Sequence, residues 1–209
     1  MRKYILATIL FTILGTFTFA QKGEEKLVRE CFEKYRTDLL NDDGVAAAED
    51  VSVKTLQYYT DLLELTKTAD SSKIETLSVM DKMMVLILRL KVSKEEILSL
   101  DGKGLFIYAV NKGMVGKGSV ANNTIGEIKI NKDFAAAQFV AKGKPSEIYF
   151  EFYKEGSWKL DVTSLFPMAT MVFDKLITDS GKSENEFLLP LIEASTGKKV
   201  TPETWLPLK

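Results

Sequence analysis

The stretch EGSWKLDVT, residues 155–163, decides the fold class. A polar turn, EGS, is followed by an alternation in which Trp158, Leu160 and Val162 are apolar and the residues between them are polar. Side chains alternate between the two faces of a β-strand, so the three apolar residues share one face. The pattern predicts a strand whose tryptophan packs against a core, and it places Asp161 on the opposite, outer face.

Three segments of the same character precede this stretch. They are TIGEIKI, FAAAQFVA and EIYFEFYK, and the turn sequences NKD, GKPS and EGS follow them. Turn residues between runs of β-branched and aromatic residues are typical of hairpins. In the third segment Ile148, Phe150 and Phe152 fall on one face. We therefore predict an antiparallel meander whose apolar face meets a common core.

The chain before residue 118 and after residue 164 has helical periodicity instead. Between residues 24 and 41 apolar residues recur every three or four positions, as on one face of an amphipathic helix. Capping patterns predict where later helices begin: Ser52 for the second, Ser72 with Glu75 for the third, and Ser93 with Glu96 for the fourth. Another helix is predicted to end at Gly113. Helices, then antiparallel strands, then a helical tail predict an α+β domain.

This order of elements, closing on a strand of the form G-x-W-K-x-D, resembles the NTF2-like superfamily of cone-shaped α+β rolls, and in particular its uncharacterised exported bacterial members. The segments that carry the resemblance are DGVAAAEDVSVKTLQYYTDLLEL, LDGKGLFIYAVNKGMVG, TIGEIKINKDFAAAQFVAKG and EIYFEFYKEGSWKLDVTSLF. The resemblance implies N-terminal helices packed on a curved antiparallel sheet, within a domain of residues 21–165. Residues 166–209 are predicted to form a helical C-terminal extension packed on the same domain.

The resemblance implies a fold more than a reaction. The superfamily includes isomerases, dehydratases, transport factors and ligand-binding modules. Its enzymes place an aspartate, a tyrosine or a histidine inside the cone, and no such set matches this chain residue by residue. Because the chain contains no histidine, the dehydratase type is excluded.

The first 20 residues have the pattern of a signal peptide. Arg2 and Lys3 precede a short apolar run, and Thr18 and Ala20 occupy the positions that a signal peptidase reads. A membrane span needs about 20 apolar residues, so an uncleaved membrane anchor is the weaker alternative. We expect cleavage after Ala20 and export to the periplasm or the cell exterior, with no stable membrane anchor afterwards.

The composition excludes several classes of function. Without histidine there is no Ser-His-Asp or Cys-His catalysis and no histidine-based metal site. Loss of Arg2 and Lys3 leaves 26 of the 28 basic residues against 29 acidic ones, without the basic stripe typical of nucleic-acid binding. Residues 41–50, NDDGVAAAED, lack the ligand alternation of a calcium loop and are interpreted as a solvated linker. We expect no metal and no cofactor.

The only cysteine, Cys31, lies inside the first predicted helix. A single cysteine forms no internal disulfide, so the stability of the domain has to come from its core. We interpret Cys31 as a small buried apolar residue rather than a reactive thiol.

Three acidic residues lie within apolar segments and are the candidates for catalysis. They are Asp81, Glu151 and Asp161. A carboxylate inside the cone would have a raised pKa and would serve as an acid or base in a small hydrolase or isomerase. Alternation, however, places Glu151 and Asp161 on the face opposite Phe150 and Leu160, where they would be solvated or paired with lysines. Asp81 is compatible with either face of its helix.

The aromatic residues suggest a binding pocket as the alternative to plain core. Those within the predicted domain include Tyr58 and Tyr108, and the predicted pocket lining is Tyr59, Met84, Phe106, Phe150, Phe152 and Trp158. We predict an exported noncatalytic module that binds a small apolar ligand or a protein partner. The third hypothesis is a homodimeric or interaction protein whose exposed sheet face carries Tyr149, Glu151, Tyr153 and Asp161.

Overall fold

The protein is an α+β fold in a computed structural model that describes residues 2–115 and 117–208, with side chains described from residue 21 onward except that of Ser119. The α-helices are α1 (Arg2–Leu40), α2 (Gly44–Ala48), α3 (Val53–Thr68), α4 (Ser71–Glu75), α5 (Val79–Lys91), α6 (Lys94–Ser99), α7 (Gly102–Asn111), α8 (Gly118–Ala121), α9 (Phe166–Ser180) and α10 (Glu184–Thr196). Within the described residues one antiparallel sheet has the strand order β1 (Asn123–Asn131), β2 (Phe134–Ala141), β3 (Lys144–Glu155) and β4 (Ser157–Asp161). The 3-10 helices η1 (Val162–Leu165) and η2 (Pro202–Trp205) complete the chain. The predicted α+β class is confirmed.

The predicted signal peptide, residues 1–20, lies outside the residues whose side chains the structure describes. In the described part of the chain, no helix combines the length and the apolar character needed to cross a membrane. Cleavage and export therefore stay predictions, as do the domain boundaries.

The first two predicted helices are confirmed. The apolar stripe of α1 is buried through Val28, Phe32, Tyr35 and Leu39, each at most 4 % exposed. Ser52 caps α3, its side chain accepting a hydrogen bond from the backbone nitrogen of Thr55. These apolar residues of α1 are three or four positions apart, so they lie on one face of the helix, and that face is the buried one.

The third predicted helix is wrong as a single element. The side chain of Asp70, not of Ser72, caps α4 by accepting a hydrogen bond of 2.8 Å from the nitrogen of Lys73. Ser78 then caps α5 by accepting one of 3.2 Å from the nitrogen of Asp81. The predicted apolar stripe is therefore divided between two helices, each with an N-cap of its own, Asp70 for α4 and Ser78 for α5.

The interpretation of residues 41–50 as a solvated linker is also wrong. Asp43 caps the short helix α2, which packs on α7. A Cβ on Gly44 would meet the carbonyl oxygen of Ile107 at 2.5 Å, so this close approach requires glycine. Asp50 is only 8 % exposed and forms a 2.7 Å ion pair with Lys34.

The sheet is the meander that the sequence predicts, and Trp158 is the second residue of its last strand. Trp158 and Leu160 are buried on the face that also holds Phe150 and Phe152. The indole Nε1 of Trp158 donates a 2.7 Å hydrogen bond to Glu24 of α1. Trp158 therefore fixes the sheet to the first helix.

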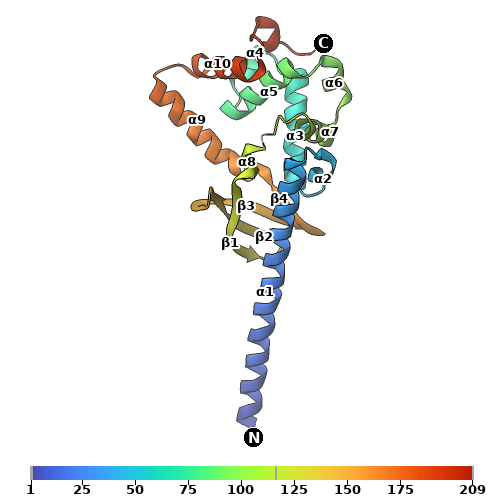
Figure 1. The fold of residues 1–209 in the computed structure, drawn as a ribbon, viewed down its shortest axis with the longest axis vertical. Helices are drawn as coiled ribbons and strands as arrows, with labels where there is room; N and C mark the ends of the chain where they lie inside the picture. The colour runs from blue at the N-terminus through green and yellow to red at the C-terminus, as the bar shows by residue number, and fades with distance from the viewer. Residues whose placement is uncertain (1, 116, 209) are drawn as a thin grey trace.

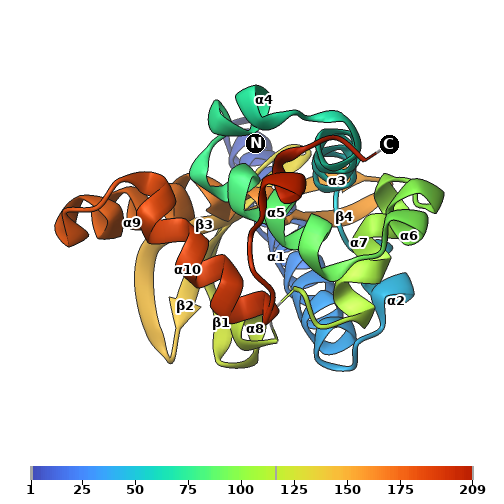
Figure 2. The same cartoon turned by 90° about the horizontal axis from the view of Figure 1, so that it is seen from above.

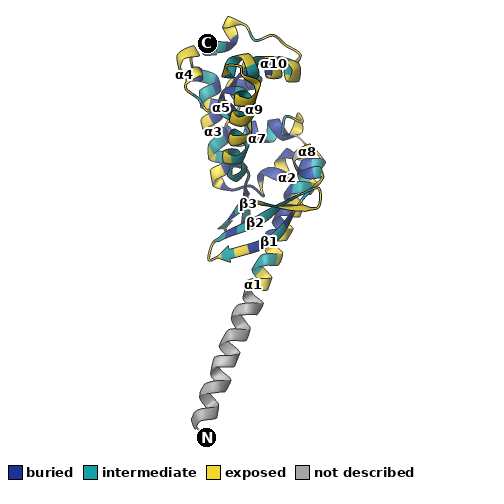
Figure 3. Cartoon of the chain, turned by 90° about the vertical axis from the view of Figure 1, so that its left-hand side faces the viewer, coloured by how far each residue is buried: buried dark blue, intermediate teal, exposed yellow. Residues whose placement is uncertain are grey.

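The helices and the sheet form an elongated body in which α9 runs along the outside from the sheet to α10 (Figure 1). Seen from above, the turn between α9 and α10 projects beyond the other helices (Figure 2). Helix α10 packs on α5 through the buried Leu188 and Ile192. Helix α9, in contrast, contains no buried residue, and its colours in Figure 3 are those of intermediate and exposed residues. It is a thin outer wall.

Candidate functional site

An apolar cavity of about 380 Å³ lies between the outer helix α9 and the rest of the protein. Residues of α1, α3, α5, α8, β3, η1, α9 and the α7–α8 connection line it: Tyr35, Tyr59, Met80, Met84, Met114, Val115, Val120, Phe150, Val162, Leu165, Phe166, Met168 and Ala169. None of these lining residues is charged. Its volume is within the range of small-molecule sites, which are mostly concave and apolar.

The chain positions this cavity by ending β4 early. The strand stops at Asp161, and η1 turns the chain so that Val162 and Leu165 enter the cavity wall before α9 begins. Val162, predicted to continue the strand, therefore lies outside it. The first turn of α9 then supplies Phe166, whose ring contacts that of Tyr58 at a centroid distance of 4.8 Å.

The structure divides the predicted pocket residues into two groups. Tyr59, Met84 and Phe150 line the cavity. Phe106, Phe152 and Trp158 do not line it, because they are packed in the core with exposed fractions of 0 %, 0 % and 3 %.

Sequence reasoning missed most of the remaining wall. Tyr35 belongs to the buried stripe of α1, and nothing in that periodic stripe distinguishes a residue at a cavity from one in the core. The wall from α9 was missed because the predicted domain ended at residue 165, just before Phe166. The methionines were the available signal, since four of the seven in the chain line the cavity: Met80, Met84, Met114 and Met168.

Asp81, the first catalytic candidate, is half-buried and lies beside a tyrosine. Its carboxylate accepts hydrogen bonds of 3.0 Å from the Tyr58 hydroxyl and 2.7 Å from the Ser78 hydroxyl. Burial, and then the negative charge of Asp81, raise the pKa of Tyr58 above its usual range. Neither Asp81 nor Tyr58 lines the cavity.

Asp161, predicted to be on an exposed outer face, is buried with an exposed fraction of 1 %. It does pair with Glu151 across the strands, as alternation predicts. The start of α3 covers it, however, because the backbone around Val51 pairs with Leu160 along the edge of β4. Asp161 accepts hydrogen bonds from Thr55 and Thr163.

Lys54 connects the two sheet acids to a tyrosine. Its ammonium group lies 3.5 Å from Asp161 and 3.9 Å from Glu151, and it donates a 2.7 Å hydrogen bond to the hydroxyl of Tyr153. Glu151 and Tyr153 are half-buried, so the predicted interaction face loses Asp161 but keeps its other residues. Asp161 and Glu151 are thus paired with Lys54 in one hydrogen-bonded network, and neither is an unpaired acid.

Cys31 is buried, as the sequence predicts. Burial raises the pKa of its thiol to about 12, so the reactive thiolate is scarce at neutral pH. Among the described residues, no cluster of three or more potential ligand side chains could hold a metal ion.

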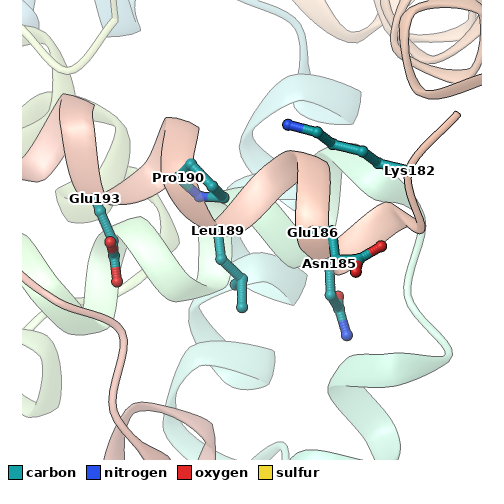
Figure 4. Close-up of a pocket in the computed structure, with 6 residues that line it drawn as sticks. All are labelled: Lys182, Asn185, Glu186, Leu189, Pro190 and Glu193. Carbon is teal, nitrogen blue, oxygen red and sulfur yellow. The ribbon is translucent and has the colours of Figure 1, made fainter. Parts of the chain in front are cut away.

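A larger concavity, of about 560 Å³, lies along α10, but three of the polar side chains in its lining, Asn185, Glu186 and Glu193, already have partners. Figure 4 shows that its lining comes from α10 and from Lys182, two residues before the helix, whose side chain is directed away from Leu189 and Asn185. Glu186 accepts hydrogen bonds from Ser183, Glu193 pairs with Lys199, and Asn185 donates to Glu75. A surface formed mainly along one helix is a weaker candidate than the apolar cavity that several elements line.

Comparisons with known protein families, with curated proteins and with solved structures found no match. The resemblance to NTF2-like rolls therefore stays a prediction.

Proposed function

We propose that the protein is a noncatalytic module that binds one small, largely apolar molecule in the cavity behind α9. The observation that carries the proposal is a 380 Å³ space with an uncharged lining. Apolar surface gains about 25 cal/mol per Å² when it leaves water for such a space.

The methionines of the wall support the same function. A thioether side chain is unbranched and polarisable, so it adapts its shape to what it contacts and packs favourably against aromatic rings. Met80 and Met84 on α5 face the cavity together with Phe150 and Phe166. A wall of this kind suits aromatic or branched hydrocarbon ligands of variable shape.

The hydrolase or isomerase alternative has less support. It needs an acid that reaches the ligand, and the lining contains no acidic residue. Asp81 is a half-buried acid beside a tyrosine, as this alternative requires. Its carboxylate, however, already accepts hydrogen bonds from Tyr58 and Ser78. A protein partner or a homodimer on the face of Tyr149, Glu151 and Tyr153 stays the third hypothesis.

The proposal also includes that the fold is an NTF2-like roll and that the protein is exported. Helices α1 and α3 contact the sheet, and the cavity lies between sheet and helices, an arrangement that supports a roll. The signal-peptide pattern of residues 1–20 supports binding outside the cytoplasm.

The experiment is a titration of the purified protein with 2-ethylnaphthalene, followed by probe fluorescence and by native mass spectrometry. We expect saturable binding of one molecule per chain with a Kd on the order of 10–100 µM, which corresponds to about 0.5 kcal/mol per heavy atom. Absence of saturation, or several molecules bound without preference for one, would refute the proposal.

A further inference from the structure

Two tyrosines from different helices meet the cavity without using their hydroxyl groups elsewhere. Tyr35 of α1 is 4 % exposed and Tyr59 of α3 is 5 % exposed, and both line the cavity. Within the described part of the chain, neither hydroxyl has a hydrogen-bond partner. Tyr58, Tyr108 and Tyr153 differ, because each of their hydroxyls donates to a carboxylate.

These two hydroxyls are nonetheless not sealed in the core. No completely buried side-chain nitrogen or oxygen of the described residues lacks a partner, so the oxygens of Tyr35 and Tyr59 each retain accessible surface. The space available to them is the cavity that both rings line. An unpaired hydroxyl in an apolar setting is destabilising, so two such hydroxyls are unfavourable unless something in the cavity bonds to them.

The two groups are neighbouring, neutral donors. Burial raises the pKa of both Tyr35 and Tyr59 above the usual range, and electrostatic interaction with Tyr59 raises that of Tyr35 further. Both hydroxyls therefore keep their protons at neutral pH. Both tyrosines line the same cavity, and a carbonyl oxygen has two lone pairs that two O–H donors can satisfy.

The surroundings exclude a charged partner for these donors. None of the lining residues carries a charge that would compensate a carboxylate or an ammonium group. Burying an unpaired ion is far more costly than burying a neutral polar group.

We propose that the ligand carries one uncharged hydrogen-bond acceptor, such as the oxygen of a ketone, ester or amide, and that the hydroxyls of Tyr35 and Tyr59 bind it. The inference rests on the proposed function of the cavity. The hydrocarbon part of the ligand then occupies the methionine-rich remainder of the space.

The test compares 2-acetylnaphthalene, a ketone, with 2-ethylnaphthalene, the hydrocarbon that lacks its carbonyl oxygen. Tyr35→Phe and Tyr59→Phe are each expected to weaken binding of the ketone about two- to tenfold, the usual net value of one hydrogen bond. The same variants are expected to leave the hydrocarbon within about twofold. Both variants should fold, because the hydroxyls they remove bond to no described protein group.

Two further measurements separate recognition from packing. The carbonyl stretch of the bound ketone, recorded by infrared difference spectroscopy, should lie at lower frequency in the parent protein than in Y35F/Y59F. Tyr149→Phe makes the same chemical change at a residue outside the cavity and should alter neither probe's affinity.

The possible results separate two failures: that no apolar ligand binds in the cavity, and that a ligand binds without using the two tyrosine hydroxyls. If neither probe binds the parent protein, the proposed function fails and the inference fails with it. If both probes bind and respond equally to the tyrosine variants, the hydroxyls bond only to water, so the inference is wrong and the function stands. If 2-naphthoate binds as tightly as the ketone, the acceptor need not be uncharged and the inference is likewise wrong.

Discussion

The substitution Ala169→Trp is expected to weaken the binding of 2-ethylnaphthalene about 100-fold. Ala169 lines the cavity from α9, so an indole at this position occupies the space of the ligand. Loss of on the order of 100 Å² of apolar contact, at about 25 cal/mol per Å², gives this factor. Since α9 contains no buried residue, we expect the midpoint of urea unfolding to change little.

The matched control is Val172→Trp on the same helix. Val172 is 51 % exposed and does not line the cavity, so this variant adds the same side chain outside the site. Its affinity for the probe should equal that of the parent protein. Equal losses in the two variants would mean that binding depends on α9 as a whole and not on the cavity.

The substitution Phe152→Ala is expected to lower the free energy of unfolding by about 3–5 kcal/mol. Phe152 is completely buried in β3, where it faces Leu160 across the strands. Truncation of such a ring removes its burial and leaves a void that the core fills only partly. Urea unfolding followed by circular dichroism measures the loss.

A milder variant, Phe152→Leu, keeps the protein folded for binding measurements. Because Phe152 does not line the cavity, this variant should bind 2-ethylnaphthalene with unchanged affinity while being less stable. A loss of affinity in Phe152→Leu would place Phe152 in the binding site, as the sequence alone predicted. The pair of substitutions therefore separates core from cavity.

Alternation predicted the strands correctly because each strand has one face on the core and one off it. The same rule failed for the environment of Asp161, since alternation tells which face a residue is on and not what covers that face. The residues that cover Asp161 are Thr55, which is 106 positions away in the chain, and its neighbours. Only the pairing of the backbone near Val51 with β4 brings them there.

The sequence predicted an apolar pocket, but it did not predict which apolar residues line it. Tyr59, Met84 and Phe150 have the same apolar, buried pattern as Phe106, Phe152 and Trp158, and only the first three line the cavity. Contact with a cavity depends on where α9 and η1 leave the body unfilled, which is a property of tertiary packing. The division of α4 from α5 likewise followed from two N-caps that compete with the predicted one.

The most direct test of ligand binding in this cavity is methyl NMR of the methionines during titration with 2-ethylnaphthalene. The aromatic probe should shift the methyl signals of Met80, Met84, Met114 and Met168, which line the cavity. The signals of Met83, on the same helix as Met84, and of Met171, which is 66 % exposed, should stay in place. Equal shifts of all six signals, shifts confined to Met83 and Met171, or no shifts at saturating probe would contradict the account.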